Sequence, residues 1–89
     1  MRRAGAGRKV DASSKTLIAA VKQFGARYLP LNGVIDGIIE HRGQHILVDW
    51  KTPGDASLTP AQAKLVAEGW AVKFVSTVEQ LQTLLGRVA

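Results

Sequence analysis

The amino-acid sequence predicts an α/β fold in which helices flank a small mixed β-sheet. Three observations indicate this fold. Apolar residues recur at helical spacing near both ends of the chain, short runs rich in isoleucine and valine lie between them, and turns with glycine or proline separate the segments. Because 89 residues can bury only one core, we expect a single domain over residues 11–89, preceded by a basic, flexible arm over residues 1–10.

The first helix is expected over residues 11–25, where Gly25 is a natural stop. Its apolar stripe consists of Leu17, Ala20, Val21 and Phe24. Three polar residues precede the stripe as candidate caps: Asp11, Ser13 and Ser14. Residues 27–32 contain Pro30, which disfavours both a helix and a central strand, so a connection or a short extended piece is expected there.

Two strands joined by a tight turn are expected next, over residues 34–40 and 45–51. Arg42 and Gly43 would form the turn, since a two-residue loop with glycine is typical of a β-hairpin. The residue pairs that this turn predicts are Ile38–Leu47, Ile39–Ile46 and His41–Gln44.

The second half of the chain predicts a helix, a strand and a last helix. The first of these helices has Pro60 at its first position and ends near Gly69. The strand is expected over residues 71–76. Ser76 and Glu79 have the spacing of a capping box, which would open the last helix. The apolar residues of that helix are Leu81, Leu84, Leu85 and Val88.

The hairpin turn determines which residues oppose one another. With Arg42 and Gly43 in the turn, Asp36 lies opposite Asp49, and directly opposed side chains share one face of a sheet. Lys51 lies two residues beyond Asp49 and therefore on the same face. Two carboxylates and one ammonium group are thus expected to converge on one surface.

This arrangement favours a divalent metal site. Opposed like charges destabilise a strand pair, and aspartate is a poor strand former, whereas a cation between two carboxylates makes their closeness favourable. The chain contains no cysteine, so the predicted ion is a hard one held by oxygens, Mg²⁺ or Mn²⁺. Asp36, Asp49 and the backbone carbonyl of Trp50 are the candidate ligands. Lys51 would orient or deprotonate the attacking water, or stabilise charge on a phosphate.

A structural interpretation of the same residues also stands. Asp49 and Lys51 would then be a solvated ion pair, and Asp36 would cap the end of a strand. We also expect structural positions for the tryptophan and histidine residues. Trp50 and Trp70 are expected in the core or at an interface, and His41 and His45 at the surface.

The net charge of +5 points to a nucleic-acid partner. Four of the twelve basic residues lie in the first ten positions: Arg2, Arg3, Arg8 and Lys9. We expect them to contact DNA phosphates, although a basic end rich in glycine is also typical of a disordered terminus. No apolar run approaches the roughly 20 residues that span a bilayer, and none follows the basic start. We therefore expect no membrane segment and no secretory signal, and a cytoplasmic location.

The sequence resembles the VRR-NUC (virus-type replication-repair nuclease) family of the PD-(D/E)XK nuclease superfamily, over about residues 13–85. The segments that carry the resemblance are NGVIDG with Asp36, VDWK with Asp49 and Lys51, LTPAQ with Gln62, and the closing GWAVKFVSTVEQLQTLL. It implies a central mixed sheet flanked by helices, and Mg²⁺- or Mn²⁺-dependent hydrolysis of DNA phosphodiesters. It also implies a homodimer that acts on branched DNA such as a four-way (Holliday) junction, in the host cytoplasm if a virus encodes it.

Two positions depart from the family pattern. The first helix offers Gln23 where many members carry a glutamate that adds to the metal site, and the second acid is Asp49 where glutamate is commoner. Whether the site holds one metal or two is therefore open. Gln62 has two compatible interpretations: the third helical residue of a capping box with Thr59, or, by resemblance, a residue near the active site that assists Lys51 or the water.

Two other functions fit the same sequence. The fold without cleavage would be a DNA-binding module, which the missing glutamate of the first helix favours. A protein–protein adaptor would use the basic arm only for solubility, and its affinity for DNA would be negligible even at low salt.

Overall fold

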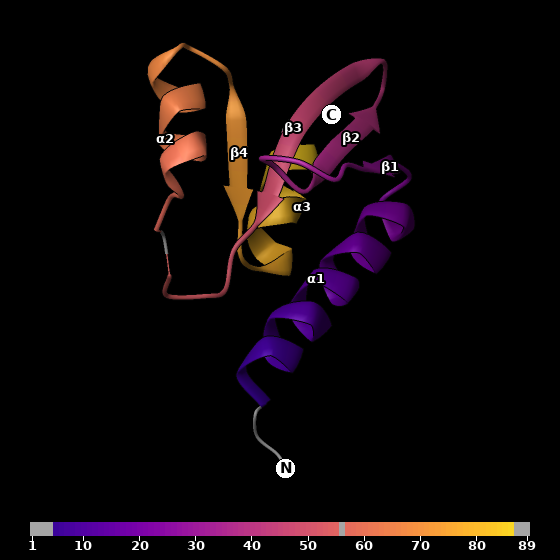
Figure 1. Ribbon diagram of the computed structural model, residues 1–89. Helices are drawn as coiled ribbons and strands as arrows, with labels where there is room; N and C mark the ends of the chain where they lie inside the picture. Colours follow the sequence, from indigo (N-terminus) through magenta and orange to yellow (C-terminus); the bar gives the residue numbers. More distant parts are fainter. Residues whose placement is uncertain (1–4, 56, 87–89) are drawn as a thin grey trace.

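The computed structural model describes residues 5–55 and 57–86, with side chains from Ser14 onward (Figure 1). Its elements follow the chain in the order α1 (Gly5–Gln23), β1 (Arg27–Pro30), β2 (Gly37–His41), β3 (Gln44–Trp50), α2 (Pro60–Ala67), β4 (Val72–Val75) and α3 (Val78–Gly86). The strands form one sheet in the order β1-β2-β3-β4, in which β3 and β4 run parallel and the other neighbours run antiparallel. The prediction of an α/β fold with a small mixed sheet is therefore confirmed.

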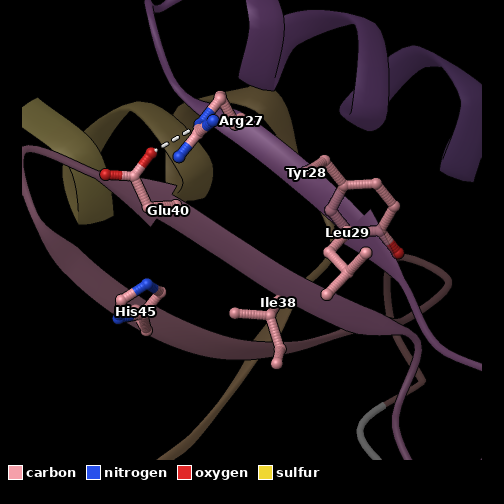
Figure 2. Close-up of a pocket in the computed structure, with 6 residues that line it drawn as sticks. All are labelled: Arg27, Tyr28, Leu29, Ile38, Glu40 and His45. Atoms are coloured by element: carbon pink, nitrogen blue, oxygen red, sulfur yellow. Dashed lines mark hydrogen bonds and ion pairs between the residues drawn. The ribbon is translucent and has the colours of Figure 1, made fainter.

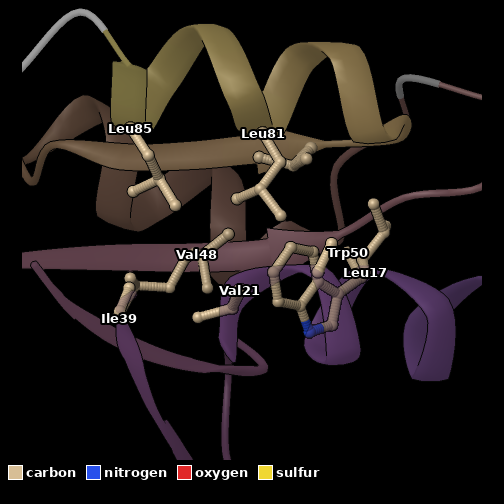
Figure 3. Close-up of a cluster of buried hydrophobic side chains, with 10 residues drawn as sticks. Leu17, Val21, Ile39, Val48, Trp50, Leu81 and Leu85 are labelled. Carbon is tan, nitrogen blue, oxygen red and sulfur yellow. The ribbon is translucent and has the colours of Figure 1, made fainter. Parts of the chain in front are cut away.

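The core lies between the sheet and the two helices α1 and α3 (Figure 3). Its buried side chains form one cluster: Leu17, Ala20, Val21, Ala26, Ile39, Val48, Trp50, Val75, Leu81 and Leu85. Successive side chains of a strand point to opposite faces of a sheet. Because Val48 and Trp50 belong to the core, Asp49 between them points to the other face of the sheet.

The hairpin between β2 and β3 has the predicted turn. Arg42 and Gly43 have φ angles of +53° and +80°, and a type I′ turn requires positive values at both residues. The predicted pairs are all present: Ile38–Leu47, Ile39–Ile46 and His41–Gln44. The pairing stops at Gly37, however, so Asp36 lies one residue before the strand and outside the paired ladder.

Other segments also differ from the predictions in their bounds or are settled by the structure. α1 begins at Gly5 and not near Asp11, because the alanine, arginine and lysine residues of this stretch favour a helix, so part of the predicted arm is helical. β1 adopts the extended alternative, and Pro30 is tolerated there because it is the last residue of an edge strand. α3 is capped one residue later than predicted, where Thr77 Oγ1 accepts the Gln80 N–H over 3.1 Å. Val88 lies outside the described residues.

Burial corrects the expectation for His41 and narrows the one for Trp70, for which a place at an interface stays a prediction. His41 is buried and not at the surface, since strand alternation places it on the same sheet face as Ile39. Trp70 is 56% exposed, which excludes a place in the core, because it follows a helix that buries only Gln62. Trp50 is in the core as expected. Among the helices of the described residues, none combines the length and the apolar character needed to cross a membrane.

Candidate metal centre

Asp36 and Asp49 meet just beyond the last residue pair of β2 and β3. Asp36 precedes β2, and its Oδ2 atom accepts the backbone N–H of Trp50 over 2.7 Å. Asp49 lies in β3 and is 5% exposed. The two carboxyl groups are close enough for the charge of Asp49 to act on Asp36. The structure thus brings together the two acids that the sequence places opposite each other.

The surroundings of Asp36 disfavour its charged form. Burial raises the pKa of the Asp36 carboxyl above its ordinary value, the backbone N–H of Trp50 opposes that rise, and the negative charge of Asp49 adds to it. The positive charge of Lys51 acts in the lowering direction on the same pKa. A shared proton or a divalent cation relieves an electrostatic conflict of this kind.

Lys51 lies beside the two acids and is largely buried. Its Nζ atom is 3.1 Å from Asp49 Oδ2 and 2.9 Å from Gln62 Oε1. It also lies 5.5 Å from the centre of the Phe74 ring, which opposes Asp49 in the neighbouring strand. The side chains of Lys51 and Asp49 are 14% and 8% exposed, so they are not the solvated ion pair of the structural interpretation. Desolvation offsets much of the attraction in a buried pair, so stability alone does not account for it.

Gln62 connects α2 to both sides of this centre. Its capping box with Thr59 is complete, because the Gln62 N–H donates to Thr59 Oγ1 and the Thr59 N–H donates to Gln62 Oε1. The same Oε1 atom accepts from Lys51 Nζ, and Nε2 donates to the carbonyl of Val34 over 3.0 Å. Both interpretations of Gln62 therefore describe contacts that are present. The amide ties Lys51 to the segment that leads into Asp36.

The other predicted site residues contribute less to this picture. Trp50 packs its indole in the core, and its backbone carbonyl stays a proposed metal ligand. Arg2 and Arg3 lie outside the described residues, as do the side chains of Arg8 and Lys9, whose backbone belongs to α1. The predicted DNA contacts of these four residues therefore stay predictions.

Tyr28 is a neighbour of the acid pair that sequence reasoning missed. Its hydroxyl donates to the Asp36 backbone carbonyl over 3.0 Å and accepts the Trp50 indole N–H over 3.1 Å. No pattern in the sequence identifies β1 as a strand paired with β2. Without that strand, nothing places Tyr28 beside Asp36.

A pocket of about 360 Å³ lies over β1, β2 and β3, and neither Asp36 nor Asp49 lines it (Figure 2). Its lining residues are Arg27, Tyr28, Leu29, Ile38, Glu40 and His45. The two charged groups of β1 and β2 neutralise each other there, since Arg27 Nε lies 2.8 Å from Glu40 Oε1. The candidate metal ligands therefore belong to the acid pair and not to this pocket.

Two carboxylates form the donor set that the described residues offer to a metal. Among those residues, no group of three or more histidine, cysteine, aspartate or glutamate side chains could hold one. Asp55, on the loop after β3, is exposed, and its Oδ1 atom accepts the Ser57 N–H over 3.0 Å. The donor set fits Mg²⁺ or Mn²⁺, because Mg²⁺ keeps several waters and usually takes one or two carboxylates plus phosphate oxygens of the substrate.

Comparisons with protein-family models, with curated proteins and with solved structures found no match to this chain. The family resemblance therefore rests on the sequence segments around Asp36, Asp49 and Gln62 and on the closing segment.

Proposed function

We propose that this protein is a Mg²⁺- or Mn²⁺-dependent deoxyribonuclease with a PD-(D/E)XK core, which hydrolyses phosphodiester bonds in DNA. One observation carries the proposal: the charge of Asp49 acts on the Asp36 carboxyl, which lies just beyond the last pair of β2 and β3, and the ammonium group of Lys51 lies 3.1 Å from Asp49. Paired carboxylates suit a hard cation, and a positioned ammonium group stabilises charge that develops on phosphate. The element order and the mixed sheet are compatible with such a core.

Each residue of the centre has a role in this proposal. Asp36 and Asp49 hold the cation, with the Trp50 carbonyl as a further oxygen ligand. A cation bound there supplies Lewis acidity to the phosphate and makes a bound water more acidic. An ammonium group has three N–H donors. Two donors of Lys51 face Asp49 and Gln62, and we assign the third to a phosphate oxygen. Because its Nζ atom already contacts two acceptor oxygens, we assign Lys51 the role of stabilising negative charge on the phosphate.

Gln62 acts in this scheme as a positioning residue. Its Oε1 atom holds Lys51, while its Nε2 atom is anchored on the Val34 carbonyl. A small displacement of a catalytic group is costly, since about 1 Å can reduce a rate about a hundredfold.

DNA is the proposed substrate because the chain is basic and the centre suits a phosphodiester. Arg2, Arg3, Arg8 and Lys9 would contact backbone phosphates, which positions DNA without reading its sequence. A chain of 89 residues covers little DNA, so a homodimer is the proposed working unit. Two active sites related by a two-fold axis suit paired cuts in branched DNA such as a four-way junction.

A DNA-binding module without cleavage is the second candidate. The observation that favours it is the small donor set: Asp36 and Asp49 have no third acid beside them among the described residues, and α1 offers Gln23 where a glutamate would extend the site. Calorimetric titration separates the two functions. A module without a metal site would show no saturable Mn²⁺ binding above the background of an Asp36→Ala variant.

The experiment that tests the nuclease is cleavage of a labelled panel of four-way junction, flap, duplex and single-stranded DNA. We expect cutting with Mg²⁺ or Mn²⁺, none with chelator, and loss of cutting in Lys51→Ala. Lys22→Ala is the matched control, because it removes the same charge from an exposed position on α1. If the wild type binds a junction without cutting it, the binding module replaces the nuclease. If Lys51→Ala cuts as well as Lys22→Ala, the role of Lys51 is refuted.

A further inference from the structure

Two groups of Asp36 are hydrogen-bonded to Trp50: the carboxylate directly, and the backbone carbonyl through the Tyr28 hydroxyl. The Trp50 backbone N–H donates to Asp36 Oδ2 over 2.7 Å. The Trp50 indole N–H donates to the Tyr28 hydroxyl over 3.1 Å, and that hydroxyl donates to the Asp36 backbone carbonyl over 3.0 Å. The three residues therefore close a ring of hydrogen bonds. This ring fixes the carboxylate and the backbone of Asp36 relative to Trp50, which belongs to the core.

Gly37 leaves the space that Tyr28 occupies. A Cβ atom at Gly37 would lie 2.5 Å from the Cε1 atom and 2.5 Å from the hydroxyl oxygen of Tyr28, and 2.6 Å from the carbonyl oxygen of Leu29. Such distances are too short for non-bonded atoms, so any side chain here would displace the phenol or β1 itself. The residue that follows Asp36 therefore has to be glycine for the Tyr28 hydroxyl to reach the Asp36 carbonyl.

Tyr28 is itself well located. Its ring and the Trp50 ring have centroids 5.6 Å apart at an angle of 46°, and Trp50 is 6% exposed. Figure 2 shows the Tyr28 ring directed away from the Arg27–Glu40 pair. Burial raises the pKa of the Tyr28 phenol, the Trp50 hydrogen bond opposes this rise, and the charges of Asp36 and Asp49 add to it.

We infer that Tyr28 is a positioning residue for the metal centre: its hydroxyl orients Asp36 so that the carboxylates of Asp36 and Asp49 face one cation. The inference rests on the proposed function. Tyr28 touches neither the cation nor the DNA in this scheme and acts through Asp36. The Leu31 N–H also donates to the Asp36 carbonyl, over 2.8 Å, so the segment stays attached to β1 when the hydroxyl is lost.

The test compares Mn²⁺ binding by the wild type and by Tyr28→Phe, which lacks only the hydroxyl. We expect the calorimetric dissociation constant to rise about tenfold, as when a group that orients a metal ligand is removed. We also expect high Mn²⁺ to restore DNA cleavage by this variant. Thr77→Ala is the control for general destabilisation, because it removes the hydrogen bond that caps α3 and leaves the contacts of Asp36 intact. Its dissociation constant should equal that of the wild type.

The outcomes separate this inference from the proposed function. If the wild type binds no Mn²⁺, both are overturned. If the wild type binds Mn²⁺ and Tyr28→Phe binds it equally well, only the role of Tyr28 is overturned and the nuclease proposal stands.

A measurement on the wild type covers the case in which Tyr28→Phe does not fold. Tyr28 is the single tyrosine of the chain, so selective labelling of tyrosine rings gives one set of NMR signals. During a Mg²⁺ titration these signals should shift with the same midpoint as Mg²⁺ binding measured by calorimetry on the wild type. Signals that stay in place while the metal binds would overturn the role of Tyr28.

Discussion

Trp50 donates its backbone N–H to the Oδ2 atom of Asp36 over 2.7 Å, immediately beyond the last pair of β2 and β3, Gly37 and Val48. The indole of the same residue is packed in the core. The position of Asp36 is therefore determined by Trp50, a residue that is fixed by packing in the core. The carboxylate therefore caps the end of the strand pair, as the structural interpretation expects. This cap is compatible with metal binding, because a carboxylate has further lone pairs to offer.

Gln62→Ala should impair cleavage more than its loss of stability explains. The variant loses the capping box, leaves the Val34 carbonyl without its partner and releases Lys51. We expect a loss of about 2 kcal/mol in the free energy of unfolding and a decrease in cleavage rate of about ten- to a hundredfold. Thr59→Ala is the comparison, because it removes the capping hydroxyl and keeps the Lys51 contact. It should lose about 1 kcal/mol and retain most of the rate, as urea unfolding and single-turnover cleavage will show. Equal rates in the two variants would contradict the positioning role.

Asp36→Asn should stabilise the metal-free protein. The substitution removes one of two adjacent negative charges, while the amide oxygen of asparagine can still accept the Trp50 N–H. We expect the free energy of unfolding in chelator to rise by up to about 1 kcal/mol. The variant should also lose the rise in melting temperature that Mn²⁺ gives the wild type. A variant that is less stable than the wild type in chelator would show that no charge conflict exists at this position.

The pH dependence of stability should carry the signature of Asp36. Its pKa is raised in the folded protein, so between the unfolded and the folded values the folded state binds more protons. This contribution to stability is fully present below the unfolded pKa, about 3.9, and is lost as the pH rises through the folded value. Glu40 and Asp55 have lowered pKa values and act in the opposite direction. These two contributions cancel when the free energy of unfolding of Asp36→Asn is subtracted from that of the wild type, both measured by urea unfolding in chelator. The difference should fall with rising pH, and a difference that rises would refute the raised pKa.

The basic residues of the arm should set the salt dependence of DNA binding. Replacing Arg2, Arg3, Arg8 and Lys9 with alanine should weaken binding to all DNA sequences alike. The slope of log affinity against log salt should decrease in magnitude by up to about 0.9 for each lost phosphate contact with duplex DNA. Fluorescence anisotropy at several salt concentrations measures this slope. An unchanged slope would show that the arm makes no phosphate contacts.

The arrangement of the hairpin could be predicted because local rules determine it. The Arg42–Gly43 turn sets the register of β2 and β3, and the register places Asp36 near Asp49. The capping box of α2 was equally readable, since Thr59 and Gln62 have the required spacing.

Features that depend on distant segments could not be read in the same way. β1 is four residues long and ends in Pro30, so it lacks a strand pattern, and the role of Tyr28 depends on that strand. The burial of Lys51 against Gln62 depends on where α2 packs after a loop, which no periodicity specifies. The burial of His41 follows from strand alternation, which continues from Ile39 to His41. A surface position was expected because His41 lies next to the turn.

The most direct test of the proposed metal centre is Mg²⁺-dependent cleavage by Asp49→Asn, assayed beside the wild type on the DNA that the panel shows to be cut best. The substitution keeps the size of the side chain and can keep its contact with Lys51, but it removes the charge that would hold the cation. We predict that cleavage falls by about a hundredfold or more while the protein stays folded. Undiminished Mg²⁺-dependent cleavage by Asp49→Asn would contradict the assignment of Asp36 and Asp49 as the catalytic metal site.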